Sequence, residues 1–375
     1  MIKVITVIGT RPEIIKLSRV IYKLDKYFEN ILVHTGQNFD YELNKVFFDD
    51  LNIREPDYYL DSAKKTVGST IGEIFKKIEP ILIKEKPSAF LILGDTNSSL
   101  SAIIAKKLKI PIFHMEAGNR SFDERVPEEI NRRIIDHIAD INMPYSDISR
   151  EYLVNEGINP EQIIKTGSPV YEVLNFYKDK IKKSKILKKL NLKKKKYFLF
   201  SLHREENVDD LNKLRNIKNI FAELIKKYDF EIIVSTHPRT KKSFDKLNFK
   251  NTNKIKFLKP FGFFDYIKLQ LNSYCVLSDS GTITEESSIL KFPAINIRNA
   301  HERPEGMDHG SVIMAGISSN RIIEAIDLTV KHHKEDKDSF VEIEDYKNLN
   351  VSKQVVRTIL SYIDSVNRDV WKKSI

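Results

Sequence analysis

Two glutamates, Glu116 and Glu128, lie close together in the sequence, and each has arginines near it. They follow the apolar run 110–113 (Ile-Pro-Ile-Phe), which has the composition of a buried strand. In α/β proteins ligands bind at the carboxyl ends of strands, so carboxylates placed there are candidates for proton transfer. This arrangement predicts that the chain is an enzyme.

A third carboxylate, Asp95, follows the apolar run 90–93 in the segment Gly-Asp-Thr-Asn, residues 94–97. Taken alone, Asp95 fits the N-cap of a helix. Because successive parallel strands end at the same edge of a sheet, we expect Asp95 and Glu116 to emerge within several ångströms of each other. Two carboxylates in a closed cleft raise at least one pKa, which suits proton transfer near neutral pH.

The helix predicted after residue 126 has two different faces. An apolar stripe is formed by Ile130, Ile134 and Ile138. Glu128 and Arg132 are four residues apart, so they share another face and can touch. An ordinary surface ion pair is the alternative interpretation of these two residues.

The segment 9–13 (Gly-Thr-Arg-Pro-Glu), followed by Lys16, predicts an anion site at the start of a helix. Pro12 suits the first helical turn, and Arg11 would stand beside a turn that offers backbone N–H groups. A capped helix with solvated charges is the alternative.

The second half of the chain has its own polar cluster in residues 279–286 (Asp-Ser-Gly-Thr-Ile-Thr-Glu-Glu). Ser280 and Gly281 permit a phosphate to approach exposed N–H groups, and residues 282 and 285 have the spacing of a capping box that starts a helix. Glu286, one turn into that helix, is placed to accept hydrogen bonds from two ribose hydroxyls. Further donors expected at the same edge are His203, Arg204, His237 and Arg239. The two halves together predict a nucleotide-linked substrate held between two domains.

These clusters need strands to position them, and strand-like apolar runs recur at intervals that leave room for helices. They are residues 4–8, 31–33, 90–93, 111–113 and 141–143 in the first half, and 197–201, 231–235, 255–258, 275–277 and 294–297 in the second. The alternation predicts an α/β fold with two Rossmann-like, doubly wound parallel sheets. A lysine-rich run after Val173 marks the boundary between the two domains.

The net charge of +10 comes from that run alone. Residues 178–196 contain eleven lysines and one acid, Asp179, so the rest of the chain sums to zero. With no aromatic residues or arginines interleaved, the run indicates a solvated helix and turn, and we expect neither a nucleic-acid nor a membrane partner.

The chain enters an apolar run at its third residue, which leaves no room for a secretory signal, and no run approaches the roughly 18 apolar residues of a bilayer crossing. We therefore expect a cytoplasmic protein. The single cysteine, Cys275, lies in an apolar context and indicates a buried structural thiol.

The glycine and histidine spacings argue against common cofactors. The sequence has no G-x-G-x-x-G, no Walker A loop, no H-E-x-x-H and no C-x-x-C. We expect no metal and no nicotinamide, and no other cofactor.

Taken together, the motifs resemble the non-hydrolysing UDP-N-acetylglucosamine 2-epimerase family. They are residues 9–13, 94–96, 116–118, 127–132, 203–207, 279–286 and 302–305, and the resemblance extends from residue 5 to about 310. It implies a GT-B-like fold with an interdomain cleft, and a last helix that crosses back to the first domain. The expected domains are 1–172 with 355–375, for the sugar and the catalytic carboxylates, and 173–354, for UDP. The resemblance also implies a homodimer.

The resemblance further implies a mechanism, in which UDP departs from C1, a 2-acetamidoglucal forms, and a proton returns to C2 on the opposite face. Proton transfer on both faces of the ring is assigned by matching positions to Asp95, Glu116 and Glu128. The remaining matches are with the diphosphate (Arg11, His203, Ser280 and Gly281), with the ribose (Glu286), with the sugar and phosphates (Lys16 and Arg132), and with UDP more generally (His237 and Arg303).

Some segments resemble one branch of the family more closely. Residues 115–120, 145–148 and 166–169 are similar to a capsule and O-antigen branch that makes UDP-N-acetyl-L-fucosamine from the 6-deoxy-L-talose sugar. The expected activity is inversion of C2 of a UDP-N-acetylhexosamine for surface polysaccharide synthesis. The alternatives are a GT-B glycosyltransferase that uses a UDP-sugar donor, and a hydrolysing UDP-sugar 2-epimerase.

Overall fold

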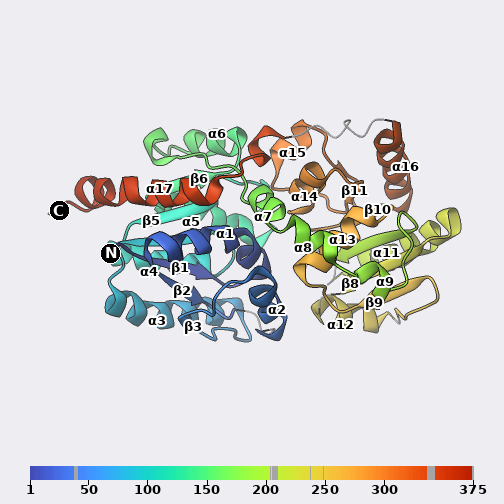
Figure 1. The fold of residues 1–375 in the computed structure, drawn as a ribbon, viewed down its shortest axis with the longest axis horizontal. Coiled ribbons are helices and arrows are strands. Elements are labelled where there is room, and N and C mark those ends of the chain that lie inside the picture. The colour runs from blue at the N-terminus through green and yellow to red at the C-terminus, as the bar shows by residue number, and fades with distance from the viewer. Residues whose placement is uncertain are drawn as a thin grey trace. The chain divides into compact units, whose positions relative to one another are not determined.

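The computed structural model describes residues 1–37, 41–202, 204, 210–236, 238–247, 249–335 and 343–373, which belong to two units (Figure 1). The first unit contains Met1–Phe176 and Glu344–Ile375, and the second contains Tyr177–Ile343. The sequence placed these boundaries at 172/173 and 354/355. Asp345 belongs to the first unit because its carboxylate accepts a hydrogen bond from Lys165 Nζ (3.0 Å) and its peptide oxygen accepts one from Ser168 N (3.2 Å).

The first unit contains a six-stranded parallel sheet with the order β3-β2-β1-β4-β5-β6. Its strands are β1 (Lys3–Ile8), β2 (Glu29–His34), β3 (Tyr58–Tyr59), β4 (Ala89–Leu93), β5 (Ile112–Ala117) and β6 (Ile141–Pro144). Five of them lie where the sequence predicts, and the two-residue edge strand β3 is too short to give a hydrophobic pattern. The strand order reverses between β1 and β4, which is where open α/β sheets bind ligands at their carboxyl edge.

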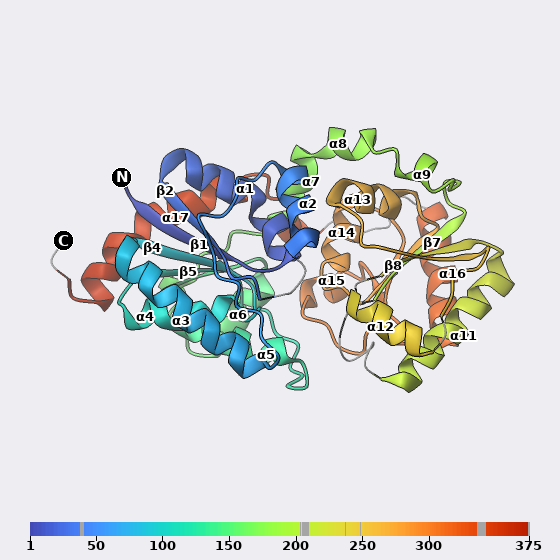
Figure 2. The ribbon, with the colours of Figure 1, turned by 90° about the horizontal axis from the view of Figure 1, so that it is seen from below.

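Helices cover both faces of this sheet (Figure 2). They are α1 (Arg11–Tyr27), α2 (Tyr41–Leu51), α3 (Val67–Glu85), α4 (Ala102–Lys107), α5 (Pro127–Ile138), α6 (Asp147–Asn155), α7 (Val170–Phe176) and α17 (Val351–Ser365), with 3-10 turns Ser99–Ser101, Pro160–Gln162 and Glu344–Tyr346 and a π-helical turn Val366–Val370. Helices α3, α4 and α5 lie on one face, whereas α1 and α17 pack together on the other. Helix α1 forms because Ile14, Leu17, Ile21 and Leu24 recur every three or four residues and bury one stripe.

The second unit repeats this architecture, with the strand order β12-β11-β10-β7-β8-β9, all parallel. Its strands are β7 (Tyr197–Leu202), β8 (Glu231–Thr236), β9 (Ile255–Leu258), β10 (Cys275–Ser278), β11 (Ala294–Asn296) and β12 (Ile313–Met314). Its helices are α8 (Lys178–Lys183), α9 (Ile186–Lys189), α11 (Leu211–Tyr228), α12 (Pro238–Lys246), α13 (Phe263–Asn272), α14 (Ile283–Leu290), α15 (Pro304–Asp308) and α16 (Ser319–Glu335). The predicted fold class, two Rossmann-like parallel-sheet domains, is confirmed.

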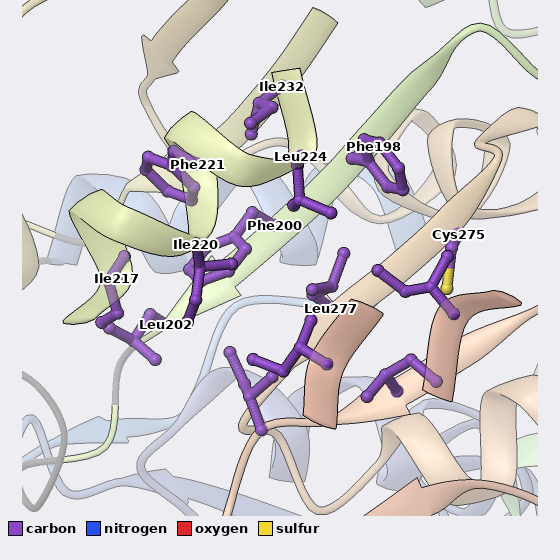
Figure 3. Close-up of a cluster of buried hydrophobic side chains, with 14 of the residues drawn as sticks. Phe198, Phe200, Leu202, Ile217, Ile220, Phe221, Leu224, Ile232, Cys275 and Leu277 are labelled. Carbon is purple, nitrogen blue, oxygen red and sulfur yellow. The ribbon is translucent and has the colours of Figure 1, made fainter. Parts of the chain in front are cut away.

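One face of the second sheet packs against α11, and Figure 3 shows this core. Ile217, Phe221 and Leu224 of α11 face Phe198 and Phe200 of β7. Cys275 is buried in the same cluster, where burial raises the pKa of its thiol far above the usual range, so it stays a structural thiol as expected.

The lysine-rich run forms α8, α9 and the turn that follows. Its lysines are exposed, whereas Ile181, Ile186 and Leu192 are buried and anchor the segment. No helix in the described ranges is both long enough and apolar enough to cross a membrane.

Candidate active site

The carboxyl ends of β4 and β5 bring Asp95 and Glu116 to one edge of the first sheet. The two strands pair in parallel, with Leu93 opposite Met115, and Asp95 follows two residues after Leu93. A Cβ placed on Gly94 would lie 3.9 Å from Glu116 Oε2, so the turn that carries Asp95 borders the Glu116 carboxylate. The expectation that these two acids share an edge is confirmed.

Glu116 does not follow the strand, as the sequence suggested, but lies within it. The pairing of β5 with β6 shifts register between Met115 and Ala117, and Glu116 has a φ of 67°. A β-bulge is the physical reason, because the extra residue leaves the ladder and re-aims its side chain. A left-handed backbone is strained for a glutamate, and such strain clusters at functional sites.

The Glu116 carboxylate is held by three side chains from separate elements. Its Oε2 accepts hydrogen bonds from Lys16 Nζ of α1 (2.6 Å) and from Tyr145 OH (3.2 Å), and its Oε1 accepts a long one from Asn119 Nδ2 (3.4 Å). Lys16 is buried, so its ammonium is a partly desolvated charge beside the acid. Lys16 was predicted from the sequence, whereas Tyr145 and Asn119 were not. No local motif marks these two residues, and only the fold brings them to Glu116.

Asp95 is paired with Arg132 of α5. Arg132 Nε donates to Asp95 Oδ2 (2.7 Å), and Arg132 Nη1 donates to Glu129 Oε2 (2.7 Å). Asn131 Nδ2 also donates to the peptide oxygen of Asp95 (2.9 Å), which fixes the turn. We predicted a contact of Arg132 with Glu128, but the bonds described for Arg132 go to Asp95 and Glu129. Glu128 is half-buried in the first turn of α5, one helical turn before Arg132.

Helix α5 buries a polar face and not the apolar stripe that its sequence shows. Its buried residues are Glu129, Arg132, Ile135 and Asp136. Ile130 and Ile134, members of the predicted apolar stripe, are 53% and 38% exposed. The charged face is the inner one because its groups find partners at the strand edge, which offsets the cost of burying them.

The loop between β1 and α1 is closed by its own glutamate. Glu13 Oε2 accepts the amides of Gly9 (2.5 Å) and Thr10 (2.9 Å), and Glu13 Oε1 accepts the hydroxyl of Thr96 (2.6 Å). These two amides are therefore not offered to an external anion, which corrects the expected backbone anion site. Arg11 stands half-buried beside them, with its guanidinium 6.0 Å from the Phe47 ring centre, and its contact with the diphosphate stays a prediction.

Burial gives Glu13 an unusual acidity. Desolvation raises its pKa to about 7, although the bonds from Thr96 and from the two amides favour the charged form. The neighbouring charge of Asp95 also raises it. Glu13 joins the loop of Arg11 to the loop of Asp95. Because Glu13 and Thr96 are 83 positions apart, local sequence patterns do not predict this link.

In the second unit, residues 280–286 form the turn and the first part of α14 after β10. The predicted capping box is wrong: Thr282, the N-cap, makes no side-chain cap, and its hydroxyl donates to Glu286 Oε1 (3.0 Å). Gln270 Nε2 of α13 donates to the other oxygen, Glu286 Oε2 (2.5 Å). Both carboxylate oxygens of Glu286 are thus held by neighbouring side chains, which fixes the group in place.

Gly281 is required by a neighbouring side chain. A Cβ at this position would lie 2.3 Å from Glu302 Oε1, which accepts a hydrogen bond from Arg204 Nη2 (2.7 Å). The backbone N–H of Arg204 donates to Asp279 Oδ2 (2.9 Å). The Ser280 and Gly281 turn thus lies beside an arginine, and Arg204 joins the predicted phosphate-binding groups.

Arg303 contacts the helix α14. It is almost fully buried, and its Nε and Nη2 each donate at 3.4 Å to the buried Glu285 Oε2. These bonds hold Arg303 against α14, and its contact with UDP stays a prediction.

Two predicted residues, His203 and His237, lie outside the described residues. Within the described part of the chain, no group of three or more His, Cys, Asp or Glu side chains is arranged to hold a metal ion. At the first sheet edge, the carboxylates of Asp95 and Glu116 each lie beside a fixed cation.

Comparison with known proteins gives consistent results. Residues 22–360 match the family model described as UDP-N-acetylglucosamine 2-epimerase. The structure of a UDP-N-acetylglucosamine 2-epimerase from Rickettsia bellii is 52% identical, with a TM-score of 0.92 over 100% of both chains. The Methanocaldococcus jannaschii enzyme, solved in complex with UDP-GlcNAc and UDP, is 36% identical with a TM-score of 0.89, over 96% of this chain and 100% of that one. A UDP-N-acetylglucosamine 2-epimerase homolog from Methanococcus maripaludis is 42% identical over 86% of this chain and 91% of its own length.

Proposed function

The chain belongs to the UDP-N-acetylglucosamine 2-epimerase family, and from this membership we propose that it inverts C2 of a UDP-N-acetylhexosamine without hydrolysing it. The observation that carries the proposal is the pair of acids at one sheet edge, Asp95 bonded to Arg132 and Glu116 bonded to Lys16. Two acids close together, each beside a cation, suit proton exchange on a sugar carbon.

The reaction needs more than a base. The hydrogen on C2 is not next to a carbonyl, so its direct removal is very unfavourable. Departure of UDP from C1, with transfer of the C2 proton to a base, gives a 2-acetamidoglucal and UDP. A proton then adds to C2 from the opposite face while the UDP oxygen re-forms its bond to C1. Asp95, Glu116 and Glu128 are the proposed proton-transfer groups.

The leaving diphosphate needs stabilisation of its developing charge. We assign this to Arg11, His203 and the Ser280 and Gly281 turn, with Arg204 beside that turn as a further cation. Glu286, fixed by Gln270 and Thr282, is assigned to the ribose. No step calls for a cofactor.

Exchange of the C2 hydrogen with solvent tests the proposal. We expect incubation with UDP-N-acetylglucosamine in deuterated water to give deuterium at C2 and the 2-epimer, without any acceptor, as followed by NMR. Absence of label from every candidate UDP-N-acetylhexosamine would contradict the proposal. Transfer that requires an acceptor would indicate a glycosyltransferase, and free UDP that rises with turnover would indicate a hydrolysing epimerase.

The sugar itself is the finer part of the proposal. The relatives support UDP-N-acetylglucosamine and its 2-epimer, whereas segments 115–120, 145–148 and 166–169 resemble the branch that forms UDP-N-acetyl-L-fucosamine. The same label experiment with the 6-deoxy-L-talose derivative compares them, because the preferred substrate has the higher kcat/KM. Either product would serve surface polysaccharide synthesis in the cytoplasm.

We also propose a homodimer formed through α5. Ile130 and Ile134 form an exposed apolar stripe on this helix, and a second copy of the chain would remove it from water. Ile134→Glu is expected to shift the protein toward the monomer in sedimentation equilibrium, because an isologous contact places the new charge at the interface twice. A dimer of unchanged affinity would contradict this interface.

A further inference from the structure

A group of buried charged side chains lies next to the turn that carries Asp95 and the bulge that carries Glu116. His114, Arg120 and Asp136 are each at most 2% exposed, and Arg120 makes two bonds to Glu156, from Nε (2.7 Å) and Nη2 (2.5 Å). None of these residues has been assigned a role in the reaction above. Buried charges are costly unless paired, so their presence here calls for a reason.

Asp136 of α5 joins the group to the loop after Glu116. Its Oδ2 accepts the backbone amide of Gly118 (3.1 Å) and Nη1 of Arg120 (2.7 Å). Gly118 has a φ of 77°, and a Cβ there would lie 2.3 Å from the peptide oxygen of Ser149. The bond to Asp136 therefore holds a turn that has little freedom, two residues after Glu116.

His114 joins the same aspartate to the loop of Asp95. Its Nδ1 lies 2.9 Å from Asp136 Oδ1, a contact of ion-pair length, and neither atom has a hydrogen-bond partner in the described part of the chain. Its Nε2 lies 3.0 Å from the peptide oxygen of Gly94, the residue before Asp95. Gly94 has a φ of 73°, so this carbonyl belongs to a second constrained turn.

Both ring nitrogens of His114 face oxygens, one of the Asp136 carboxylate and one of the Gly94 peptide group. His114 and Arg120 hold the pKa of Asp136 below its usual value, although burial opposes this. The ring therefore lies between Asp136 and the turn that carries Asp95.

We propose that Asp136 and His114 are positioning residues, which hold the turn of Asp95 and the bulge of Glu116 at the separation that proton transfer at C2 requires. The proposal rests on the proposed epimerase function. Helix α5 also carries Arg132, which donates to the Asp95 carboxylate. One helix therefore holds the turns next to both acids and also the carboxylate of Asp95. Misplacement of a reacting group by about 1 Å can cost about 10²-fold in rate.

Asp136→Asn tests this proposal, with Asp140→Asn as its matched control. Asp140 is equally buried and paired, accepting Lys106 Nζ (2.5 Å) and the amide of Ile112 (2.9 Å), but it lies at the opposite edge of the same sheet. We expect Asp136→Asn to lower kcat for C2 deuterium incorporation by about 10²-fold with KM and UDP affinity unchanged, because the loops shift while the second unit is untouched. Asp140→Asn is expected to lose comparable thermal stability but to retain kcat.

A second substitution separates positioning from simple destabilisation. In the double variant His114→Gln with Asp136→Asn, the amide of Gln can donate to the Gly94 oxygen and accept from Asn, so we expect part of the kcat to return. A merely structural role predicts that the double variant is worse than either single one. Equal kcat for Asp136→Asn and Asp140→Asn would overturn the proposal.

If the wild-type protein itself incorporates no deuterium, the proposed function fails; if it does and the variants behave alike, only this inference fails.

Discussion

Asp95→Asn is expected to bind UDP as the wild-type protein does and to lose C2 deuterium incorporation by about 10²- to 10⁴-fold, the usual contribution of a general acid or base. The asparagine amide keeps the shape of the side chain and can still accept from Arg132, whose Nε lies 2.7 Å from Asp95 Oδ2. It cannot take up or return a proton. Asp95 itself is assigned no contact with UDP, and the ribose group and the Ser280 and Gly281 turn belong to the second unit, so affinity for UDP should be nearly unaffected.

Calorimetry with UDP and the NMR label experiment measure the two quantities on the same protein. Asp57→Asn is the matched control: Asp57 also pairs with an arginine, Arg54 Nη1 (2.7 Å), but it precedes the edge strand β3, which β2 and β1 separate from β4. The control should retain full incorporation. Substantial turnover by Asp95→Asn, or a loss of UDP binding that equals the loss of turnover, would exclude Asp95 from the chemistry.

The shared edge of Asp95 and Glu116 could be predicted because it depends on local patterns alone. Each apolar run predicts a buried parallel strand, and parallel strands joined by helices end at one edge. The pairing of Leu93 with Met115 then follows from adjacency of β4 and β5. The same reasoning located the Ser280 and Gly281 turn after β10.

The inner face of α5 could not be predicted in this way. Helical periodicity shows which residues share a face, but not which face is buried. The decision depends on partners elsewhere in the sequence: Glu129 accepts the amides of Ser121 (3.0 Å) and Phe122 (3.2 Å), and Arg132 reaches Asp95. Polar groups with such partners can be buried at little net cost, so the isoleucines remain outside.

The bulge at Glu116 and the bond from Gln270 to Glu286 escaped prediction for related reasons. A bulge adds one residue to a strand without changing its composition, so the apolar pattern of β5 gives no signal. Gln270 lies on the buried side of α13 among apolar residues, and its partner on α14 is known only once the two helices meet. Long-range hydrogen bonds are a property of the fold, not of the local sequence.

Glu13→Gln is expected to make the first unit more stable at alkaline pH and to leave it almost unchanged in acid. The pKa of Glu13 is about 7 in the folded protein against a normal value of 4.5. Between these pH values the folded state binds the proton more tightly than the unfolded state, so wild-type stability falls as pH rises. The loss is complete above pH 7 and amounts to about 3 kcal/mol for this buried group. Glutamine mimics the protonated acid and avoids the loss.

Urea unfolding at pH 4.5 and at pH 8.5 measures this difference, followed by the fluorescence of Trp371, the single tryptophan, which lies in the first unit. Glu85→Gln provides a control of opposite sign. Bonds from Tyr58 and Lys3 hold the pKa of Glu85 well below normal, so its stabilising effect is present above pH 4.5 and its removal should weaken the protein at pH 8.5. If Glu13→Gln gave the same change at both pH values, the pKa of Glu13 would be the same in the folded and unfolded protein, and the loops of Arg11 and Asp95 would not be joined by a group that titrates near neutrality.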